Sequence, residues 1–423
     1  MAVISLKYGS QELSLKFDPD LFDIIEASEP TTPLSDSEVG RKLDSPIGHS
    51  NIEEYVEKGG SVLLVVPDAT RSSASGQIVN LLVRRLIASG IQPFDIRAII
   101  ATGIHRKTTD AEKADILTPF IYQRIKTLDH EPKDLMGLIR VGETATGVPV
   151  ELNRALFEHD HVFLIGSVSF HYFAGFTGGR KLICPGLASS RTISETHKLA
   201  FDCETLSRRK GVGTGMLKGN PVHEAFLQAA AFVPRPFLIT TLVNEAGECV
   251  DIFCGDLSAS HEAACTAYAK NHSVTIKEKR DLVIASCGGS PYDINLIQAH
   301  KTLENASKAC VDGGTIVLLA ECQEGLGRDD MGKWFDAADS RDLAVRLCQK
   351  YQVNGQTAWS IREKSERFNI LIVSNFDEDS VRSFGFEKIE FSALEQLVGT
   401  GGRTGYIVPR AASVNIKEKS RPN

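Results

Sequence analysis

Residues 169–181 (SFHYFAGFTGGRK) combine an imidazole, aromatic rings, three glycines and a final Arg-Lys pair. They follow directly after an apolar run at residues 162–165, which predicts a buried strand. Glycine has no side chain to block the approach of a ligand to the backbone. The segment therefore predicts a binding loop at the end of a strand, with Lys181 placed against the ligand.

Two further polar loops also follow predicted strands. Residues 67–71 (PDATR) come after the apolar run at 61–66, and residues 102–106 (TGIHR) come after the run at 96–101. In open α/β sheets, ligands bind beyond the carboxyl ends of parallel strands. We therefore expect these loops and residues 169–181 to form one site.

His105 and His171 are the candidate proton carriers of that site. A lone loop histidine is often only a hydrogen-bond partner of the backbone, but two at one sheet edge favour an acid/base pair, because imidazole exchanges protons near neutral pH. Asp68 and Arg71 could be a local ion pair of small energetic weight. The forked guanidinium of Arg71 is equally suited to hold a substrate carboxylate.

His197 is a candidate metal ligand. The spacing of Thr192 and Glu195 matches a capping box, which predicts that His197 lies in the first turn of a helix, where it could also be plain surface. Imidazole suits nickel, copper and zinc. A metal held by this one imidazole would need its other ligands from something other than nearby side chains.

Two nucleotide-binding signatures are missing. The Walker motif requires Ser or Thr after its lysine, whereas Leu182 follows Lys181 and Arg180 precedes it. No GxGxxG follows the first strand of the α/β pattern, so diffusible NAD gains no support from the sequence.

The bulk composition limits the class of protein. A chain of 423 residues predicts two domains, and 42% hydrophobic with 24% charged residues is ordinary for a globular protein. The formal charge of −7 gives no general attraction to nucleic acid, and no apolar run reaches the roughly 20 residues that span a bilayer. The nine cysteines are dispersed without a CxxC pair, which predicts reduced thiols. We expect a cytoplasmic protein that binds neither nucleic acid nor membrane.

The elements that must position these residues alternate in an α/β pattern after a hairpin at residues 2–16. A helix is expected at 74–89, and strands are expected at residues 61–66, 96–101, 162–165, 281–285, 315–319, 369–373 and 406–408. We predict two α/β domains, each built on a mainly parallel sheet with flanking helices, and an active site in the cleft between them. Residues 1–276, rejoined by 405–423, are the predicted cofactor-binding and catalytic domain, and residues 277–404 the domain that closes over the substrate. The tail after Ala411 is expected to be frayed.

Gln298 and Lys301 are three residues apart in a helix predicted over residues 293–309, so they share one face. Solvated surface is the usual fate of such residues. The preceding turn, residues 287–291 (CGGSP), is nevertheless of the kind that faces a cleft.

Taken together, these motifs resemble the nickel-pincer lactate racemase family, whose members racemise or epimerise 2-hydroxyacids. The resemblance covers essentially the whole chain, and the motif at residues 171–181 is long and specific. The motifs that carry it are DATR at 68–71, TGIHR at 102–106, HYFAGFTGGRK at 171–181, His197, and INLIQAHK at 294–301.

The resemblance implies a cofactor, the nickel-pincer nucleotide (pyridinium-3-thioamide-5-thiocarboxylic acid mononucleotide), joined covalently to Lys181. It implies that His197 is the protein ligand of Ni²⁺ and that Asp68, Ala69, Thr70 and Arg71 contact the cofactor. Enzymes that build the cofactor are then implied partners.

The same resemblance implies that His105 and His171 are the acid/base pair, while hydride passes reversibly from C2 of the substrate to the cofactor. Arg71, Gln298 and Lys301 would bind the 2-hydroxyacid. Ile297 stands where lactate-specific members carry a tyrosine, so another short hydroxyacid or a longer sugar acid is also open as substrate. Trp334 and Trp359 are both candidates for a tryptophan near the site. The alternatives are an oxidoreductase that uses diffusible NAD on a 2-hydroxyacid, and a non-catalytic relative that binds a small molecule.

Overall fold

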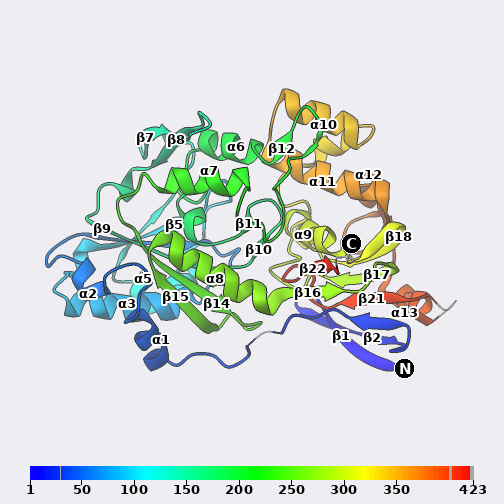
Figure 1. Cartoon of the computed structure of the whole chain (residues 1–423), viewed down its shortest axis with the longest axis horizontal. Helices are drawn as coiled ribbons and strands as arrows, with labels where there is room; N and C mark the ends of the chain where they lie inside the picture. Colours follow the sequence, from blue (N-terminus) through cyan, green and yellow to red (C-terminus); the bar gives the residue numbers. More distant parts are fainter. Residues whose placement is uncertain (29, 400–402, 420–423) are drawn as a thin grey trace. The chain divides into compact units, whose positions relative to one another are not determined.

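The computed structural model describes residues 1–28, 30–399 and 403–419, which form two compact units (Figure 1). The large unit comprises residues 29–200 and 210–270. The small unit comprises residues 1–28, 201–209 and 271–423. Residues 201–209 are therefore a short excursion of the chain into the small unit.

The large unit is built on a six-stranded sheet of order β15-β14-β9-β4-β5-β6, in which only the β14–β15 pair is antiparallel. Its strands are β4 (Val62–Pro67), β5 (Ile96–Ala101), β6 (Lys126–Asp129), β9 (His161–Ser167), β14 (Phe237–Val243) and β15 (Cys249–Gly255). Central strands such as β4 are continuous runs of buried aliphatic residues, as expected when helices cover both faces of a parallel sheet.

Helices cover both faces of this sheet. Alternate residues of β4, Val62, Leu64 and Val66, pack into a core with buried residues of α1 to α4. On the opposite face, Leu182 of the short helix η3 meets Gly166 of β9, where an added Cβ would lie 3.2 Å from the leucine. The helices are α1 (Asp36–Leu43), α2 (Ile52–Tyr55), α3 (Ser75–Ala88), η1 (Pro93–Asp95), α4 (Asp110–Leu117), α5 (Pro119–Tyr122), η2 (Arg154–Leu156), η3 (Gly179–Leu182), α6 (Ser190–Lys198), α7 (Pro221–Ala230) and α8 (Leu257–His272). Two small hairpins, β7 (Leu138–Glu143) with β8 (Pro149–Asn153) and β10 (Phe170–His171) with β11 (Gly175–Phe176), complete the unit.

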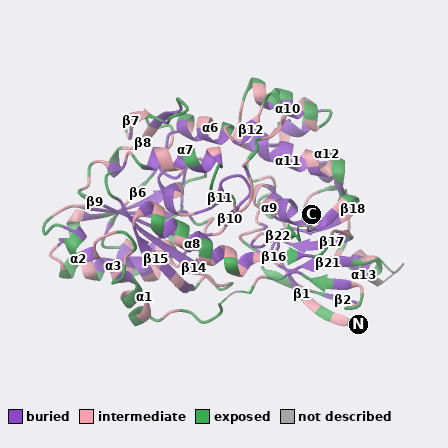
Figure 2. Cartoon of the chain, in the orientation of Figure 1, coloured by how far each residue is buried: buried purple, intermediate pink, exposed green. Residues whose placement is uncertain are grey.

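The small unit has its own six-stranded sheet, of order β20-β19-β18-β17-β21-β3, in which every pair is parallel. Its central strands are buried on both faces (Figure 2). The strands of the unit are β1 (Ala2–Tyr8), β2 (Gln11–Phe17), β3 (Phe22–Ile24), β12 (Phe201–Asp202), β13 (Ser207–Arg208), β16 (Ser273–Ile276), β17 (Arg280–Ser286), β18 (Cys310–Leu319), β19 (Asn369–Val373), β20 (Glu387–Lys388), β21 (Gly405–Val408) and β22 (Asn415–Glu418). Its helices are α9 (Leu296–Ala306), η4 (Gly332–Asp336), α10 (Ser340–Gln349), α11 (Val353–Arg367), α12 (Glu378–Ser383) and α13 (Phe391–Gly399).

The strands predicted from the sequence are confirmed, and β5 and β19 have the predicted bounds. The two units divide the chain differently from the predicted domains, which placed residues 1–28 and 405–423 with the first domain. The reason is strand pairing: β3 pairs with β21, and β21 pairs with β17, so residues 22–24 and 405–408 both belong to the sheet of the small unit. The expectation of a frayed tail is wrong for residues 415–418, because β22 pairs in parallel with β16.

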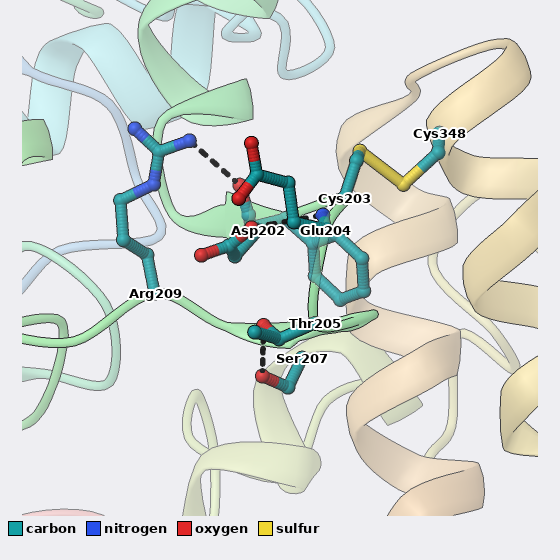
Figure 3. The surroundings of a disulfide bond; sticks show 8 residues. Asp202, Cys203, Glu204, Thr205, Ser207, Arg209 and Cys348 are labelled. Carbon is teal, nitrogen blue, oxygen red and sulfur yellow. Dashed lines mark hydrogen bonds between the residues drawn. A yellow bond between two sulfur atoms is a disulfide. The ribbon is translucent and has the colours of Figure 1, made fainter.

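The prediction that all cysteines are reduced is also wrong. Cys203 and Cys348 form a disulfide that joins the 201–209 excursion to α10 (Figure 3). The cysteines lie 145 residues apart in the chain, a separation at which sequence spacing gives no sign of pairing. The other seven cysteines are buried free thiols.

Among the described residues, no helix is both long enough and apolar enough to cross a bilayer.

Candidate functional site

The three polar loops predicted to converge do follow adjacent parallel strands of the large unit. Strand β4 pairs on one side with β5 and on the other with β9. The loop after β5 is tied to the segment after η3, because the Gly103 N–H donates to the Gly186 carbonyl at 2.9 Å. Gly103 has a φ of +55°, a conformation that suits glycine. Backbone contacts thus bring the loop that carries His105 to the segment that follows Lys181.

Asp68 and His105 form a hydrogen-bonded pair in which the carboxylate is buried and the imidazole is partly exposed. The Asp68 carboxylate is 5% exposed, and its Oδ2 lies 2.7 Å from His105 Nδ1. Its Oδ1 accepts hydrogen bonds from the backbone N–H and the hydroxyl of Thr70, at 3.0 and 2.5 Å. Burial raises the pKa of Asp68, but His105, Thr70 and Arg71 outweigh burial and hold that pKa at about 2. The carboxylate is therefore ionised.

This contact fixes the tautomer of His105. An ionised carboxylate can only accept, so Nδ1 of the imidazole must carry the proton that is shared with Asp68. In the neutral ring Nε2 then has a free lone pair, and 40% of the side chain is exposed. His105 is arranged as a proton acceptor at Nε2.

His171 is arranged the opposite way. It ends strand β10 and pairs with Gly175 of β11, in a tight hairpin that buries the imidazole to 7% exposure. Its Nδ1 accepts long hydrogen bonds from the backbone N–H groups of Ala174 (3.4 Å) and Phe173 (3.5 Å). An accepting Nδ1 places the proton of the neutral ring on Nε2. The two histidines thus present a lone pair and an N–H respectively.

The Phe173 ring lies between the side chains of His171, His197 and Lys181. It makes an edge contact with His171 (centroids 4.4 Å apart) and another with His197 (5.0 Å), while Lys181 Nζ lies 5.4 Å from its centroid. Phe226 of α7 forms a second wall, with its ring 5.3 Å from that of His197 and 5.4 Å from Lys181 Nζ. One pair of aromatic rings therefore holds the lysine amine and the His197 imidazole side by side.

His197 is a neutral imidazole. It is 6% exposed, and its Nδ1 lies 2.7 Å from the Ile193 carbonyl, so Nδ1 carries the proton and Nε2 keeps its lone pair. Burial, followed by the charge of Lys181, lowers the pKa of His197 to about 3. A neutral imidazole whose other nitrogen donates to a carbonyl is the usual state of a metal ligand.

The predicted position of His197 in its helix is wrong. Helix α6 begins at Ser190 with Ser189 as its N-cap, so His197 lies in the last turn rather than the first. The Thr192 hydroxyl cannot cap the helix, because it bonds the Pro149 carbonyl and the Glu151 N–H, both at 2.9 Å. These contacts are long-range and leave no local sign in the sequence.

The remaining candidates divide between the two units. Ala69, Thr70 and Arg71 form the turn after β4, where the Arg71 N–H donates to the Asp68 carbonyl at 3.1 Å. Gln298 and Lys301 lie on α9 of the small unit, and their predicted shared face is confirmed because Lys301 Nζ donates to Gln298 Oε1. Trp334 and Trp359 are both buried in the core of the small unit.

The sequence alone does not mark Phe226, Asn220 or His261 as parts of the site. Asn220 caps α7 and donates to the Phe173 carbonyl at 2.8 Å, which fixes Phe226 and Phe173 relative to each other. The pair Asn220-Pro221 does predict the start of a helix. The neighbouring sequence does not predict which loop this helix contacts. In the described part of the chain, no three His, Cys, Asp or Glu residues gather as a metal site, so an all-protein metal centre finds no support there.

Comparisons with known proteins point to one family. The lactate racemase N-terminal domain family matches residues 8–207, and the lactate racemase C-terminal domain family matches residues 275–381. Lactate racemase of Lactiplantibacillus plantarum is 30% identical over 81% of this chain and 80% of its own. That of Thermoanaerobacterium thermosaccharolyticum is 28% identical over 83% of this chain and 82% of its own.

Two solved structures share the fold. The lactate racemase apoprotein from Thermoanaerobacterium thermosaccharolyticum superposes with a TM-score of 0.88 at 24% identity, over 99% of this chain and 100% of that one. A protein from Thermotoga maritima gives a TM-score of 0.72 at 20% identity, over 92% of this chain and 99% of that one. The predicted two-domain α/β fold is thereby confirmed.

Proposed function

Because this chain belongs to the lactate racemase family and is a racemase-type isomerase, we propose that it inverts C2 of a 2-hydroxyacid with a nickel-pincer nucleotide on Lys181. The observation that carries the proposal is the pair formed by Lys181 and His197. A primary amine that could be acylated and a neutral imidazole with a free Nε2 lone pair lie against the same two aromatic rings.

The residues present fit this group. Among the described residues, the donor set near Lys181 offers the His197 imidazole nitrogen and no cluster of carboxylates. A metal there therefore needs a partner that brings its own ligands. His197 would hold the Ni²⁺, Lys181 would carry the covalent link, and residues 68–71 would contact the nucleotide. When bound, the group supplies a reversible hydride acceptor, which no side chain can provide.

In the proposed reaction, side chains of the protein transfer the protons and stabilise the charges that form. His105 accepts the hydroxyl proton of the substrate at Nε2, and Asp68 stabilises the resulting imidazolium. His171 supplies the proton to the substrate oxygen from Nε2 when the opposite enantiomer forms; it does so as an imidazolium, which the step returns to the neutral ring. In the reverse direction the two histidines exchange roles. The hydrogen bond between His105 Nδ1 and Asp68 supports the role of His105 as the proton acceptor.

The substrate carboxylate needs cations. Arg71 is half-buried beside the ionised Asp68 and offers a forked donor set for an anion. By the family resemblance, Gln298 and Lys301 also bind the substrate. Because Ile297 replaces the tyrosine of lactate-specific members, the substrate class is written as 2-hydroxyacids rather than lactate alone.

Loading of the cofactor is the first test. The protein is produced together with the cofactor-building enzymes and its intact mass and nickel content are measured. We expect an adduct on the peptide that contains Lys181 and about one nickel per chain. Lys181→Arg is the matched control, because it keeps the charge but forms no such link. An adduct mass retained in that variant would overturn the assignment of Lys181.

Turnover is the second test. The loaded protein is incubated with a panel of single-enantiomer 2-hydroxyacids that carry deuterium at C2, and the products are separated by chiral chromatography. We expect inversion with retention of the label, since hydride returns to the carbon from which it left. Loss of deuterium to water would instead indicate carbanion exchange and would contradict the proposed role of the cofactor.

A further inference from the structure

Arg180, the neighbour of Lys181, is a buried cation that the proposed reaction does not use. It is 1% exposed and heads the largest fully buried side chains of the described residues. Its Nη2 donates to the Ala174 carbonyl at 2.9 Å and its Nη1 donates to the Gly178 carbonyl at 3.3 Å. Nη1 also lies 2.9 Å from His261 Nε2 of α8. One guanidinium therefore joins two points of the 171–181 loop to a helix.

In the described residues, no carboxylate neutralises the charge of Arg180. Among residues 1–28, 30–399 and 403–419, no Asp or Glu forms an ion pair with Arg180, and its buried Nε has no hydrogen-bond partner. Burial lowers the pKa of Arg180 to about 10, which still leaves it charged at neutral pH. A buried charge without an ion partner is costly. Its presence here therefore calls for a role beyond packing.

The loop it holds has little stiffness of its own. Gly175, Gly178 and Gly179 all have positive φ, at +78°, +72° and +54°. A Cβ at Gly178 would lie 2.6 Å from the Ser167 carbonyl, and one at Gly179 would lie 2.6 Å from the His261 ring. Glycine is thus required for the close approach of the loop, but glycine also leaves the free chain many conformations.

The ends of this loop carry the chemistry. His171 opens it and Lys181 closes it, and the carbonyls that Arg180 holds, those of Ala174 and Gly178, lie between them. Ala174 also provides one of the N–H groups that bond to His171 Nδ1, so the same residue is held by its carbonyl and orients the imidazole by its amide. A change at Arg180 would reach His171 through Ala174.

We propose that Arg180 is a positioning residue whose guanidinium, anchored on His261, fixes the 171–181 loop so that His171 and Lys181 keep their relative placement. The role in catalysis rests on the proposed function. The role in ordering the loop does not, because it can be measured in protein without cofactor.

The first measurement is amide hydrogen exchange of the cofactor-free protein. Arg180→Met removes the charge and every donor while keeping much of the volume, and Arg180→Lys keeps the charge with fewer donors. We expect the peptide that covers residues 171–181 to exchange at least about tenfold faster in the Met variant and less in the Lys variant. The amides of Thr177 and Lys181, which bond the carbonyls of Ser169 and Gly178, report on the loop.

A control separates loop order from general stability. Val79→Ala removes a buried side chain of α3, on the sheet face that packs with α1 to α4, and lowers the stability of the same unit. In the Val79→Ala variant, we expect the exchange rate of residues 171–181 to stay unchanged relative to that of the adjoining peptides. Wild-type exchange of the loop in Arg180→Met, or equal acceleration in Val79→Ala, would overturn the proposal. If Arg180→Met yields no folded protein, Arg180→Lys serves in its place and must accelerate exchange of the loop for the proposal to stand.

The second measurement uses the loaded protein. We expect kcat to fall about 10- to 100-fold in Arg180→Met with KM changed little, since the loop positions reacting groups rather than the substrate carboxylate, and Arg180→Lys to recover part of the loss. A proportional rise of KM with unchanged kcat would contradict the role. If the wild type itself shows neither adduct nor turnover while loop exchange still depends on Arg180, the proposed function fails and the loop-ordering role stands.

Discussion

At the scale of single residues, the two catalytic candidates differ in what their Nδ1 atoms contact. His105 faces the ionised Asp68 carboxylate, whereas His171 faces backbone N–H groups. The first contact leaves Nε2 as an acceptor and the second leaves it as a donor. The proposed reaction needs one ring that accepts a proton and one that donates it, and the Asp68 contact prepares His105 for the first role before any substrate binds.

Replacing Asp68 by Asn tests this arrangement. The amide keeps the size of the carboxylate but no longer requires a proton on Nδ1 of His105 and no longer stabilises an imidazolium. We expect kcat to fall by about 10²- to 10⁴-fold while Lys181 remains modified. Steady-state kinetics with intact mass in parallel measure both. Thr70→Ser, which keeps the hydroxyl that bonds Asp68, is the control and should retain activity.

The same carboxylate gives a pH dependence of stability. The pKa of Asp68 is about 2 in the folded protein, below its ordinary value of 3.8, so its stabilising contribution is present above pH 4 and is lost as the pH falls through about 2. The contribution is about 2 kcal/mol. Urea unfolding from pH 7 to pH 2 should show a gap between wild type and Asp68→Asn that is constant above pH 5 and shrinks below pH 4. A gap that is independent of pH down to 2 would contradict the ionised, paired state.

At the scale of elements, a buried ion cluster attaches the 201–209 excursion to two helices of the small unit. Glu304 of α9 is 4% exposed and accepts from Arg208 of β13 at 2.5 Å and from Lys364 of α11 at 2.8 Å. These cations hold the pKa of Glu304 well below its ordinary value despite burial. The excursion is therefore fixed to the helix that carries Gln298 and Lys301.

Glu304→Gln should destabilise the small unit strongly. The substitution removes the buried carboxylate that Arg208 and Lys364 share, although Lys364 keeps its contact with Glu363. Breaking a buried ion pair typically costs about 3–5 kcal/mol. Urea unfolding at pH 7 measures the change. Glu378→Gln breaks an exposed pair with Arg382 and is the matched control, for which little change is expected. Equal effects of the two substitutions would mean that the Glu304 cluster is not desolvated as described.

The helices and strands also show which structural features can be predicted from the sequence. Apolar runs predicted the strands well, because buried strands such as β5 and β19 consist largely of consecutive apolar residues. The positions of the polar loops after these strands predicted the sheet edge at which Asp68 and His105 meet. The start of α6 was missed because Thr192 is engaged by β8, and Phe226 was missed because only the folded chain brings α7 to Phe173. Local pattern thus identified the chemical groups, while contacts between distant segments determine their protonation and surroundings.

At the scale of the whole molecule, the chain leaves the large unit after α6, visits the small unit over residues 201–209 and returns. The disulfide between Cys203 and Cys348 lies within the small unit, yet the loop that it closes contains residues 210–270 of the large unit. Cys203 is exposed and Cys348 is partly buried. A covalent bond therefore adds to the Glu304 cluster in holding the excursion to the small unit.

Removal of this bond should lower stability. A crosslink stabilises mainly by restricting the unfolded chain, and disulfides typically contribute about 2–4 kcal/mol. Cys203→Ser, Cys348→Ser and the double variant should all unfold at the same lower urea concentration, because each removes the same bond. Titration of thiols in denaturant, without reductant, should find the seven free cysteines in the wild type. Nine reactive thiols there, or additive losses from the two single substitutions, would mean that the bond does not form and that the excursion depends on Glu304 alone.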